Sequence, residues 1–343
     1  MRIKKLFLPL IAISILFACN QSERKNNIDL VKPELNNQVN DTLIYSDPKN
    51  YLMVLDGVKD SSEVKISSYK ELLALFEKLN YTQEAWQAGI REVPRVYLQI
   101  IGEKWGSTSS KEVSIDNKKR IFFRGLAPLL LRSNELIKED QSKLKSFIQA
   151  HSQNEELSNN DHKWIIKLAK VYQVDLTNDQ LTVSTLEELS KKVDIIPVSL
   201  ALAQAAEESG WGTSRFAAEG NSLYGQWSWG ENAITPENQR KGLGNYGIAA
   251  FETLQQSVCA YMLNLNTHNA YSSFRNKRNE LRKESKKLSG YELAGQLTKY
   301  SERGEDYVKT IRGLMDYNHL IATDSAYLSN SSPIYLIPKK EKQ

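Results

Sequence analysis

The run "LALAQAAEESGWG" at 200–212 constrains the fold of this chain more than any other segment. Residues 200–206 are apolar around almost the whole circumference of a helix, so that helix has to be buried on most sides. We expect it to begin near Pro197, which suits a first helical turn, and to end ahead of Gly210. The remaining elements must then pack around this helix, which predicts a mainly α fold.

Two adjacent acids, Glu207 and Glu208, close this run. Helical spacing places Glu208 on the same face as Gln204 and Glu207 on the next face. The negative end of the helix dipole and an apolar environment both raise the pKa of a carboxyl group, which suits a general acid. The alternative is a helix end with two solvated glutamates. Periodicity alone does not choose between the two acids.

The segment after the acids changes character, because 210–253 is rich in Gly, Trp, Asn and Tyr. It reads as loops with a short hairpin around 242–251. Aromatic rings stack on the apolar faces of sugars, and amides bond to sugar hydroxyls. The residues that offer these groups soon after the acids are Asn221, Tyr224, Gln226 and Trp227. The alternative is that these aromatic side chains only cover the core.

Apolar residues at three and four spacing predict further helices along the chain. We expect a kink or break at Pro128 and a capping box formed by Ser184 and Glu187. Residues 324–343 read as an irregular tail. The sequence thus predicts a mainly α protein with a small irregular or β-hairpin lobe. The expected helical segments are 69–81, 93–101, 118–151, 160–174, 184–196, 254–267 and 289–320.

The charge of the chain argues against a nucleic-acid partner. The formal net charge is +4, and three of the cations, Arg2, Lys4 and Lys5, lie in the first five residues. The body is therefore nearly neutral and lacks a basic footprint. The four histidines are scattered without metal-ligand spacing, and the glycine-rich stretches lack the strand and helix context of nucleotide loops. We expect no metal and no organic cofactor.

The N-terminus resembles a bacterial lipoprotein signal. A basic start precedes thirteen mostly apolar residues at 6–18, which are too few to span a bilayer, and Cys19 follows at once. This pattern predicts a signal peptide over 1–18 and lipidation of Cys19; the alternative is an ordinary signal peptide cut nearby. We expect a membrane lipoprotein of the cell envelope, on the periplasmic side. Cys259 would remain as a single thiol in the core.

The stretch "PVSLALAQAAEESGWGTSRFAAEGNSLYGQW" resembles the signature of bacterial peptidoglycan N-acetylglucosaminidases of glycoside hydrolase family 73, nearest to the Bax-type branch. The likeness extends over about 93–320. It implies a lysozyme-like α-helical catalytic domain. It also implies that the acid is the Glu before Ser-Gly-Trp-Gly, which is Glu208, with Glu207 as its neighbour. The expected units are a tether at 19–62, an N-terminal helical region at 63–183, the catalytic domain at 184–323 and a tail at 324–343.

The resemblance also implies the remaining site residues. Its tyrosine-bearing helix places Tyr300 with Glu208 in catalysis and Tyr307 in the groove. Many family members carry a second acid, but here Glu237 and Glu252 are not in the family's usual setting. This departure argues against the paired-carboxylate scheme. Substrate-assisted chemistry needs only one protein acid, and a water-mediated inverting path needs a base that the sequence does not identify. The expected substrate-binding residues are Gln204, Trp211, Asn221, Tyr224, Gln226, Trp227, Tyr246 and Tyr307.

The expected activity is an endo-β-N-acetylglucosaminidase that cleaves the β-1,4 bond after N-acetylglucosamine in peptidoglycan. Its partners would be glycan strands and, through acylated Cys19, a lipid bilayer. Three alternatives remain: a lytic transglycosylase, a non-catalytic peptidoglycan-binding lipoprotein, and a glycoprotein-directed endoglucosaminidase.

Overall fold

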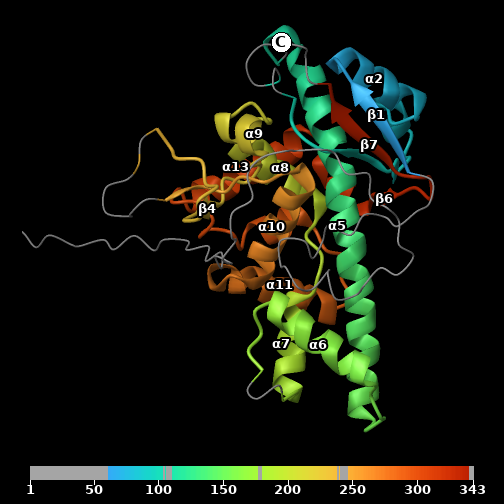
Figure 1. The fold of residues 1–343 in the computed structure, drawn as a ribbon, viewed down its shortest axis with the longest axis vertical. Helices are drawn as coiled ribbons and strands as arrows, with labels where there is room; N and C mark the ends of the chain where they lie inside the picture. Colours follow the sequence, from blue (N-terminus) through green and yellow to red (C-terminus); the bar gives the residue numbers. More distant parts are fainter. Residues whose placement is uncertain are drawn as a thin grey trace, which may run out of the picture.

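A computed structural model describes residues 61–102, 105, 110–176, 180–237, 239 and 246–339. The predicted signal peptide, Cys19 and nearly all of the tether lie outside the described residues. The fold is mainly α, as predicted, and consistent with a lysozyme-like helical domain (Figure 1). The helices are α2 (Tyr69–Lys78), α3 (Gln83–Gln87), α4 (Ser110–Glu112), α5 (Ile115–Ser152), α6 (Asn159–Val171), α7 (Val183–Lys192), α8 (Val198–Ser209), α9 (Arg215–Gly220), α10 (Leu254–Thr267), α11 (Ser272–Lys283), α12 (Gly290–Ala294) and α13 (Glu305–Tyr317), with short 3₁₀ helices η3 (Asn269–Tyr271) and η4 (Leu320–Ser325).

Helix α8 is the buried centre that its sequence predicts. Residues 200–206 are at most 1% exposed, and α5, α12, α13 and η4 all pack against the helix. Pro197 is its N-cap, and Gly210 ends it in the left-handed conformation with φ of 56°. Glycine adopts that conformation without steric cost. The position of this helix fixes the place of the two acids in its last turn.

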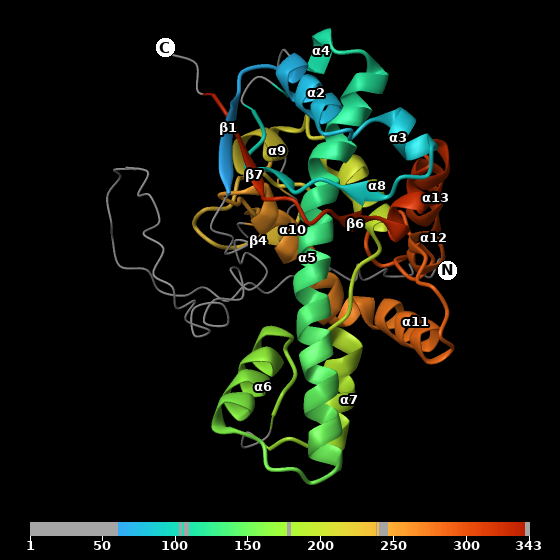
Figure 2. The same ribbon diagram turned by 90° about the vertical axis from the view of Figure 1, so that its right-hand side faces the viewer.

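Helix α5 runs as one long rod along the molecule (Figure 2). The predicted break at Pro128 is wrong, because the helix continues without interruption from Ile115 to Ser152. Proline removes one helical hydrogen bond, but the stretch 125–131 is largely buried against neighbouring elements. Tertiary packing thus holds the helix together at the point where local sequence disfavours it.

Helix α7 begins earlier than expected, and the capping residues predicted for it are wrong. Its N-cap is Thr182, whose side chain accepts from the backbone N–H of Thr185, and the Thr185 hydroxyl in turn accepts from the backbone of Thr182. Ser184 therefore lies inside the helix. The physical reason is that a threonine supplies the same acceptor oxygen as a serine two residues earlier.

Short strands lie within 93–101 and within the tail, which corrects the helix predicted for the first segment and the irregular structure predicted for the second. In the three-stranded sheet, β7 (Ile334–Pro338) lies between β1 (Ser62–Ile66) and β3 (Val96–Leu98), and both pairings are parallel. Leu336 is paired with Val64 on one side and with Leu98 on the other, and it is fully buried. The tail is therefore ordered by strands that lie far away in the sequence. The remaining strands are β2 (Glu92–Val93) with β6 (Tyr327–Leu328), and β4 (Trp227–Ser228) with β5 (Gly247–Ile248).

The N-terminal helical region packs against the loops that follow α8. The backbone N–H of Ile101 donates to Asn221 Oδ1 at 3.0 Å, and the Trp105 Nε1–H donates to the Trp211 carbonyl at 3.2 Å. One hydrophobic core includes residues of both regions. The N-terminal helical region and the segment 184–323 therefore pack as one unit, while the boundary proposed between them stays a prediction.

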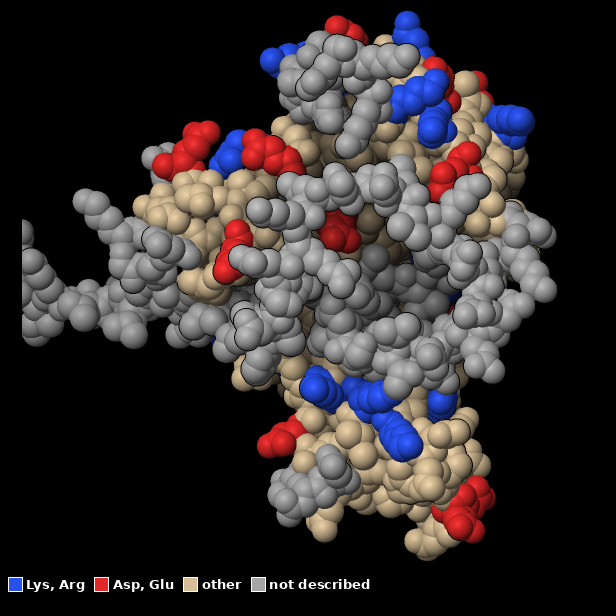
Figure 3. Space-filling view, viewed as in Figure 1, with Lys and Arg blue, Asp and Glu red and all other residues tan. Residues whose placement is uncertain are grey.

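Cys259 lies in α10 and is fully buried, as predicted for a small core residue. Burial raises the pKa of its thiol to about 12, which keeps the thiol protonated at neutral pH. No described helix combines the length and the apolar character needed to cross a membrane. On the described part of one face, basic and acidic side chains form several separate groups (Figure 3).

Candidate active site

Glu208 lies in the last turn of α8, with part of its side chain exposed and most of it surrounded by protein. Burial raises the pKa of its carboxyl group to about 7, and the neighbouring Glu207 adds to the rise. A hydrogen bond with Tyr307 and the charge of Arg303 oppose the rise. Glu208 is therefore close to half protonated at neutral pH, which is the state that a general acid needs.

Glu207 is placed differently from its neighbour. Its Oε1 accepts from Arg303 Nη2 in a 2.6 Å ion pair near the surface, and the guanidinium also lies 5.3 Å from the ring centre of Tyr307. The structure thus separates the two acids that helical periodicity left equivalent, and this separation supports the choice of Glu208.

A chain of buried hydrogen bonds leads to Glu208. Gln204 is fully buried; its Oε1 accepts from the Tyr261 hydroxyl at 2.7 Å and its Nε2 donates to the Tyr307 hydroxyl at 2.9 Å. Tyr307 is 1% exposed and bonds to Glu208. The side chains of Gln204 and Tyr307 are buried and bond to each other, so substrate binding by these two residues stays a prediction.

Tyr300 belongs to a row of tyrosine rings beside the acid. It stacks on Tyr307 with ring centres 5.4 Å apart and an interplanar angle of 8°, and its other neighbour is Tyr271 at 5.7 Å. Its hydroxyl lies 3.5 Å from the Tyr224 carbonyl oxygen, and the residue is partly exposed. The position next to Tyr307 agrees with a role near Glu208, and the catalytic role of Tyr300 stays a prediction.

The segment after α9 passes directly beside the acid. Gly225 adopts φ of 59°, and a side chain added there would begin 3.8 Å from Glu208 Oε2. Asn221 starts this segment with φ of 50°; its Oδ1 accepts from Ile101 and its Nδ2 donates to the Phe251 carbonyl. The side chain of Asn221 is thus engaged with backbone groups, so it supports the loop rather than a sugar.

Tyr224 and Gln226 lie in the same segment. Tyr224 is 2% exposed and stacks flat on Tyr261, with ring centres 3.8 Å apart and an angle of 7°. This stacking places the ring in the core, and the prediction that Tyr224 stacks on sugar stays untested. Gln226 is partly exposed, and its role in binding stays a prediction.

An aromatic cluster marks the small β lobe. Trp227 stacks on Tyr246 at 4.6 Å with an angle of 23°, and Trp229 lies 6.4 Å from Trp227. Tyr246, which stacks on Trp227, is 5% exposed, whereas Trp229 is 45% exposed. The pairing of β4 with β5 gives the lobe two short antiparallel strands, while most of the first half of the hairpin predicted around 242–251 lies outside the described residues. Trp227 is partly exposed, and sugar stacking by Trp227 and Tyr246 stays a prediction.

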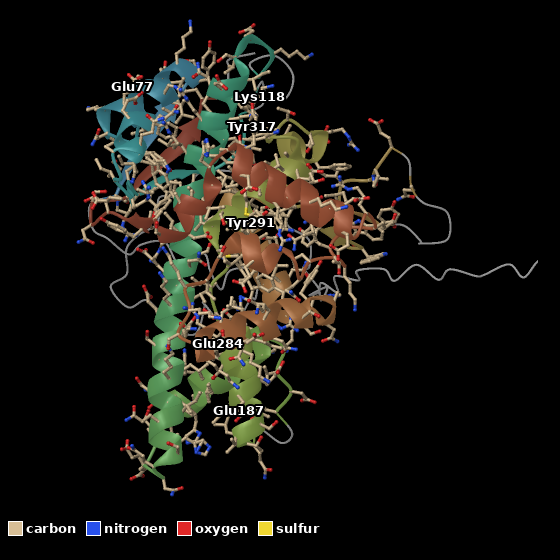
Figure 4. The ribbon with its side chains drawn as sticks, turned by 180° about the vertical axis from the view of Figure 1, so that it is seen from behind. Glu77, Lys118, Glu187, Glu284, Tyr291 and Tyr317 are labelled. Carbon is tan, nitrogen blue, oxygen red and sulfur yellow. The ribbon has the colours of Figure 1, made fainter. Side chains whose placement is uncertain are left out.

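Trp211 faces helix α5. Its φ of 62° turns the chain after Gly210, and its ring centre lies 5.1 Å from Phe123 and 5.8 Å from Phe122. Lys119 lies near this ring and 4.3 Å from the ring of Tyr317. Figure 4 shows this junction from behind, where the end of α13 meets the first turns of α5. These contacts support a packing role, and sugar stacking by Trp211 stays a prediction.

Three residues around the acid were not anticipated. Arg303 holds Glu207, Tyr261 begins the hydrogen-bond chain, and Tyr271 continues the row of rings. Arg303 lies within the "YSERGEDY" segment that carries the family resemblance, so its charge was a usable signal. Tyr261 and Tyr271 gave no signal, because an aromatic residue in an apolar helical pattern reads as core.

Comparison with known proteins finds one family and one relative that are similar to this chain. Residues 183–331 match the family Glucosaminidase, described as mannosyl-glycoprotein endo-beta-N-acetylglucosaminidase. The chain is 32% identical over 190 residues to Protein bax of Escherichia coli (strain K12). That alignment covers 55% of this chain and 66% of the relative, just under two thirds of its length. The chain is thus similar to Protein bax, and its residues 183–331 are similar to the Glucosaminidase family. No solved structure gives a significant match.

Proposed function

We propose that this protein hydrolyses the β-1,4 bond after N-acetylglucosamine in peptidoglycan glycan strands, with Glu208 as the general acid. The observation that carries the proposal is the state of Glu208, whose carboxyl group has a pKa of about 7 within a glucosaminidase-family domain. A protonated Glu208 transfers its proton to the glycosidic oxygen as the bond to the anomeric carbon breaks. The resulting carboxylate then accepts a proton from the attacking water.

The environment of Glu208 favours a scheme with a single protein carboxyl group. Among the described carboxylates, only Glu207 shifts the pKa of Glu208, and its ion pair with Arg303 keeps it engaged. We propose that the acetamido oxygen of the substrate attacks the anomeric carbon and that water then opens the cyclic intermediate. Tyr300, next to Tyr307 and partly exposed, is the candidate for orienting the acetamide.

The proposed setting is the cell envelope. Lipidation of Cys19 would attach the protein to a bilayer and leave the folded part beside the glycan strands. This part of the proposal rests on the sequence of the first nineteen residues. Radiolabelled fatty acid should enter the wild-type protein in bacteria, and a Cys19→Ala variant should take up none.

A lytic transglycosylase is the second candidate. Among the described residues, no carboxylate other than the neighbouring Glu207 acts on Glu208, and this favours the transglycosylase, because that reaction uses one acid and no water. It would leave an anhydro-sugar end in place of a hydrated one. A non-catalytic wall-binding role predicts binding without new ends, and the printed family description makes mannosyl glycoproteins a further substrate to test.

The test is product analysis on purified sacculi. The protein should release fragments that end in reducing N-acetylglucosamine, identified by borohydride reduction and mass spectrometry. Glu208→Gln should remove at least about a hundredfold of this activity, because it deletes the proton donor. Glu187→Gln is the matched control, since it makes the same chemical change at an exposed position on α7 (Figure 4). Anhydro ends, or full release by Glu208→Gln, would contradict the proposal.

A further inference from the structure

A cavity of about 270 Å³ lies at the first turn of α8, at the opposite end of this helix from Glu208. A helix of 12 residues is about 18 Å long, so the cavity is separate from the acid. Helix α5 and strand β6, which pack together, form one side of it (Figure 2). The start of α8, the end of α11 and the segment that follows α11 form the other sides.

Most of the cavity lining is apolar. Tyr327 adds an aromatic ring that is 56% exposed. The volume is slightly below the usual range of sites for drug-sized ligands, so it suits a ligand with a short apolar body. The other apolar lining residues are Leu131, Ile195, Pro197, Val198, Leu288, Ala326 and Leu328.

Two of the charged side chains in the lining are ion paired within the protein. Glu135 accepts from both terminal nitrogens of Arg95 at 2.9 Å, and Arg132 adds a bond at 3.2 Å. Arg282 donates to the two carboxylate oxygens of Asp194 at 2.8 and 3.0 Å. The charges of Glu135 and Arg282 are therefore compensated without a ligand.

The remaining charged residues of the lining are Asp324, Lys138 and Lys287. Both oxygens of Asp324 accept hydrogen bonds, from the backbone and hydroxyl of Ser199 and from the backbone of Gly290. Lys138 and Lys287 are exposed, and neither forms an ion pair or a hydrogen bond with any described residue. Two ammonium groups against one carboxylate leave one positive charge uncompensated at the cavity.

We propose that this cavity binds a compact organic carboxylate, with its apolar body against the lining and its carboxylate between Lys138 and Lys287. One negative charge compensates the excess positive charge, whereas a phosphate ester brings about −1.5 to −2. Peptide C-termini that end in small apolar residues share this chemistry with short fatty acids. Binding at this cavity does not depend on the function proposed for Glu208.

The rival explanation is that two exposed lysines attract any anion. Attraction by charge alone ignores the apolar body of the ligand, so it predicts that inorganic phosphate binds as well as an organic carboxylate does. Burial of the ligand in the cavity predicts the opposite, because apolar contacts add to the charge interaction. The choice of probes therefore separates the two explanations.

Chemical-shift titration of the full-length, isotope-labelled protein at neutral pH is the direct test. Acetyl-alanyl-alanine and hexanoate each carry a carboxylate on a short apolar body. We expect saturable shifts at Lys138, Lys287 and Ala326 with at least one of them, and the tighter binder identifies a peptide terminus or an acyl chain as the source. Acetyl-alanyl-alanine amide and inorganic phosphate should bind at least about threefold more weakly. No saturable binding of either carboxylate, or equal binding of the amide or of phosphate, would overturn the proposal.

Variants locate the ligand on the protein. Lys138→Gln and Lys287→Gln should each weaken binding by about two- to fivefold, because each removes one exposed charge interaction. Ala326→Leu should fill part of the cavity and weaken binding further, with circular dichroism as the check on folding. Lys283→Gln is the matched control, since it removes an exposed charge near the end of α11, outside the lining, and should leave binding unchanged.

The variants also provide outcomes that contradict the proposal. An equal loss of binding in Lys283→Gln and Lys287→Gln would indicate unspecific attraction. Unchanged binding in a folded Ala326→Leu variant would place the ligand outside the cavity, and so would loss of binding in Glu208→Gln. If the wild-type protein hydrolyses no glycan, the function proposed for Glu208 fails, and the titration still decides on the cavity.

Discussion

The raised pKa of Glu208 has a consequence for stability that can be worked out from the structure. The ordinary value is 4.5, and burial brings the pKa in the folded protein to about 7. Because the folded-state value is the higher one, stability is fully present below the unfolded value and is lost as the pH rises through about 7. The upper limit of this loss is about 3 kcal/mol between about pH 4.5 and about pH 8.5. Since Glu208 is partly exposed, we expect about 1.5 to 2 kcal/mol.

Glu208→Gln removes the charge and keeps an oxygen that can accept from Tyr307. The free energy of unfolding of the variant should therefore not fall as the pH rises. Its excess over the wild-type value should grow by about 1.5 to 2 kcal/mol between about pH 4.5 and about pH 8.5. Urea unfolding followed by circular dichroism at each pH measures the difference directly. The exposed Glu187→Gln variant controls for the loss of one carboxyl group. A difference between Glu208→Gln and wild type that does not change with pH would refute the reasoning.

Two further predictions concern the support of α8. Arg278 is fully buried and donates to the carbonyls of Asp194 and Lys191, and its side chain lies 3.6 Å from the Asp194 carboxylate. Because the Arg278→Met variant leaves this carboxylate without its buried partner, it should unfold with a free energy lower by about 3–5 kcal/mol, measured in guanidinium. Although burial opposes it, Arg278 and Arg282 hold the pKa of Asp194 below its ordinary value. The stability that Asp194 contributes is therefore present above about pH 4 and lost as the pH falls, and Arg278→Met should weaken this acid dependence. Asp324 accepts from the Ser199 backbone and hydroxyl and from Gly290; Asp324→Ala should lower the unfolding free energy by about 2–4 kcal/mol, and Asp324→Asn by less.

Local patterns predicted the parts of the fold that local interactions determine. The apolar circumference of 200–206 required a buried helix, and Pro197 and Gly210 marked its ends. The strand pairing of the tail could not be predicted, because β7 pairs with β1 across some 270 residues and the sequence of neither strand indicates its partner. The continuity of α5 through Pro128 likewise depends on packing that no local pattern contains.

In the candidate site, too, local sequence predicted some features and distant contacts determined the others. Helical spacing correctly put Gln204 and Glu208 on one face, but it did not reveal that Tyr261 and Tyr307 would meet Gln204 there. The difference between Glu207 and Glu208 depends on Arg303, which lies almost a hundred residues later. Residue type alone suggested that Tyr224 stacks on sugars, whereas the structure buries its ring in the core against Tyr261.

The central claim is that the proton delivered to the substrate comes from Glu208. Its most direct test compares two titrations of the wild-type protein: the pKa of Glu208 from carbon-13 NMR, and the midpoint of the alkaline limb of sugar release from sacculi. The account predicts that both fall near 7 and coincide, because activity is lost when Glu208 ionises. A Glu208 carboxyl group that titrates near its ordinary value of 4.5, while sugar release persists well above that pH, would contradict it.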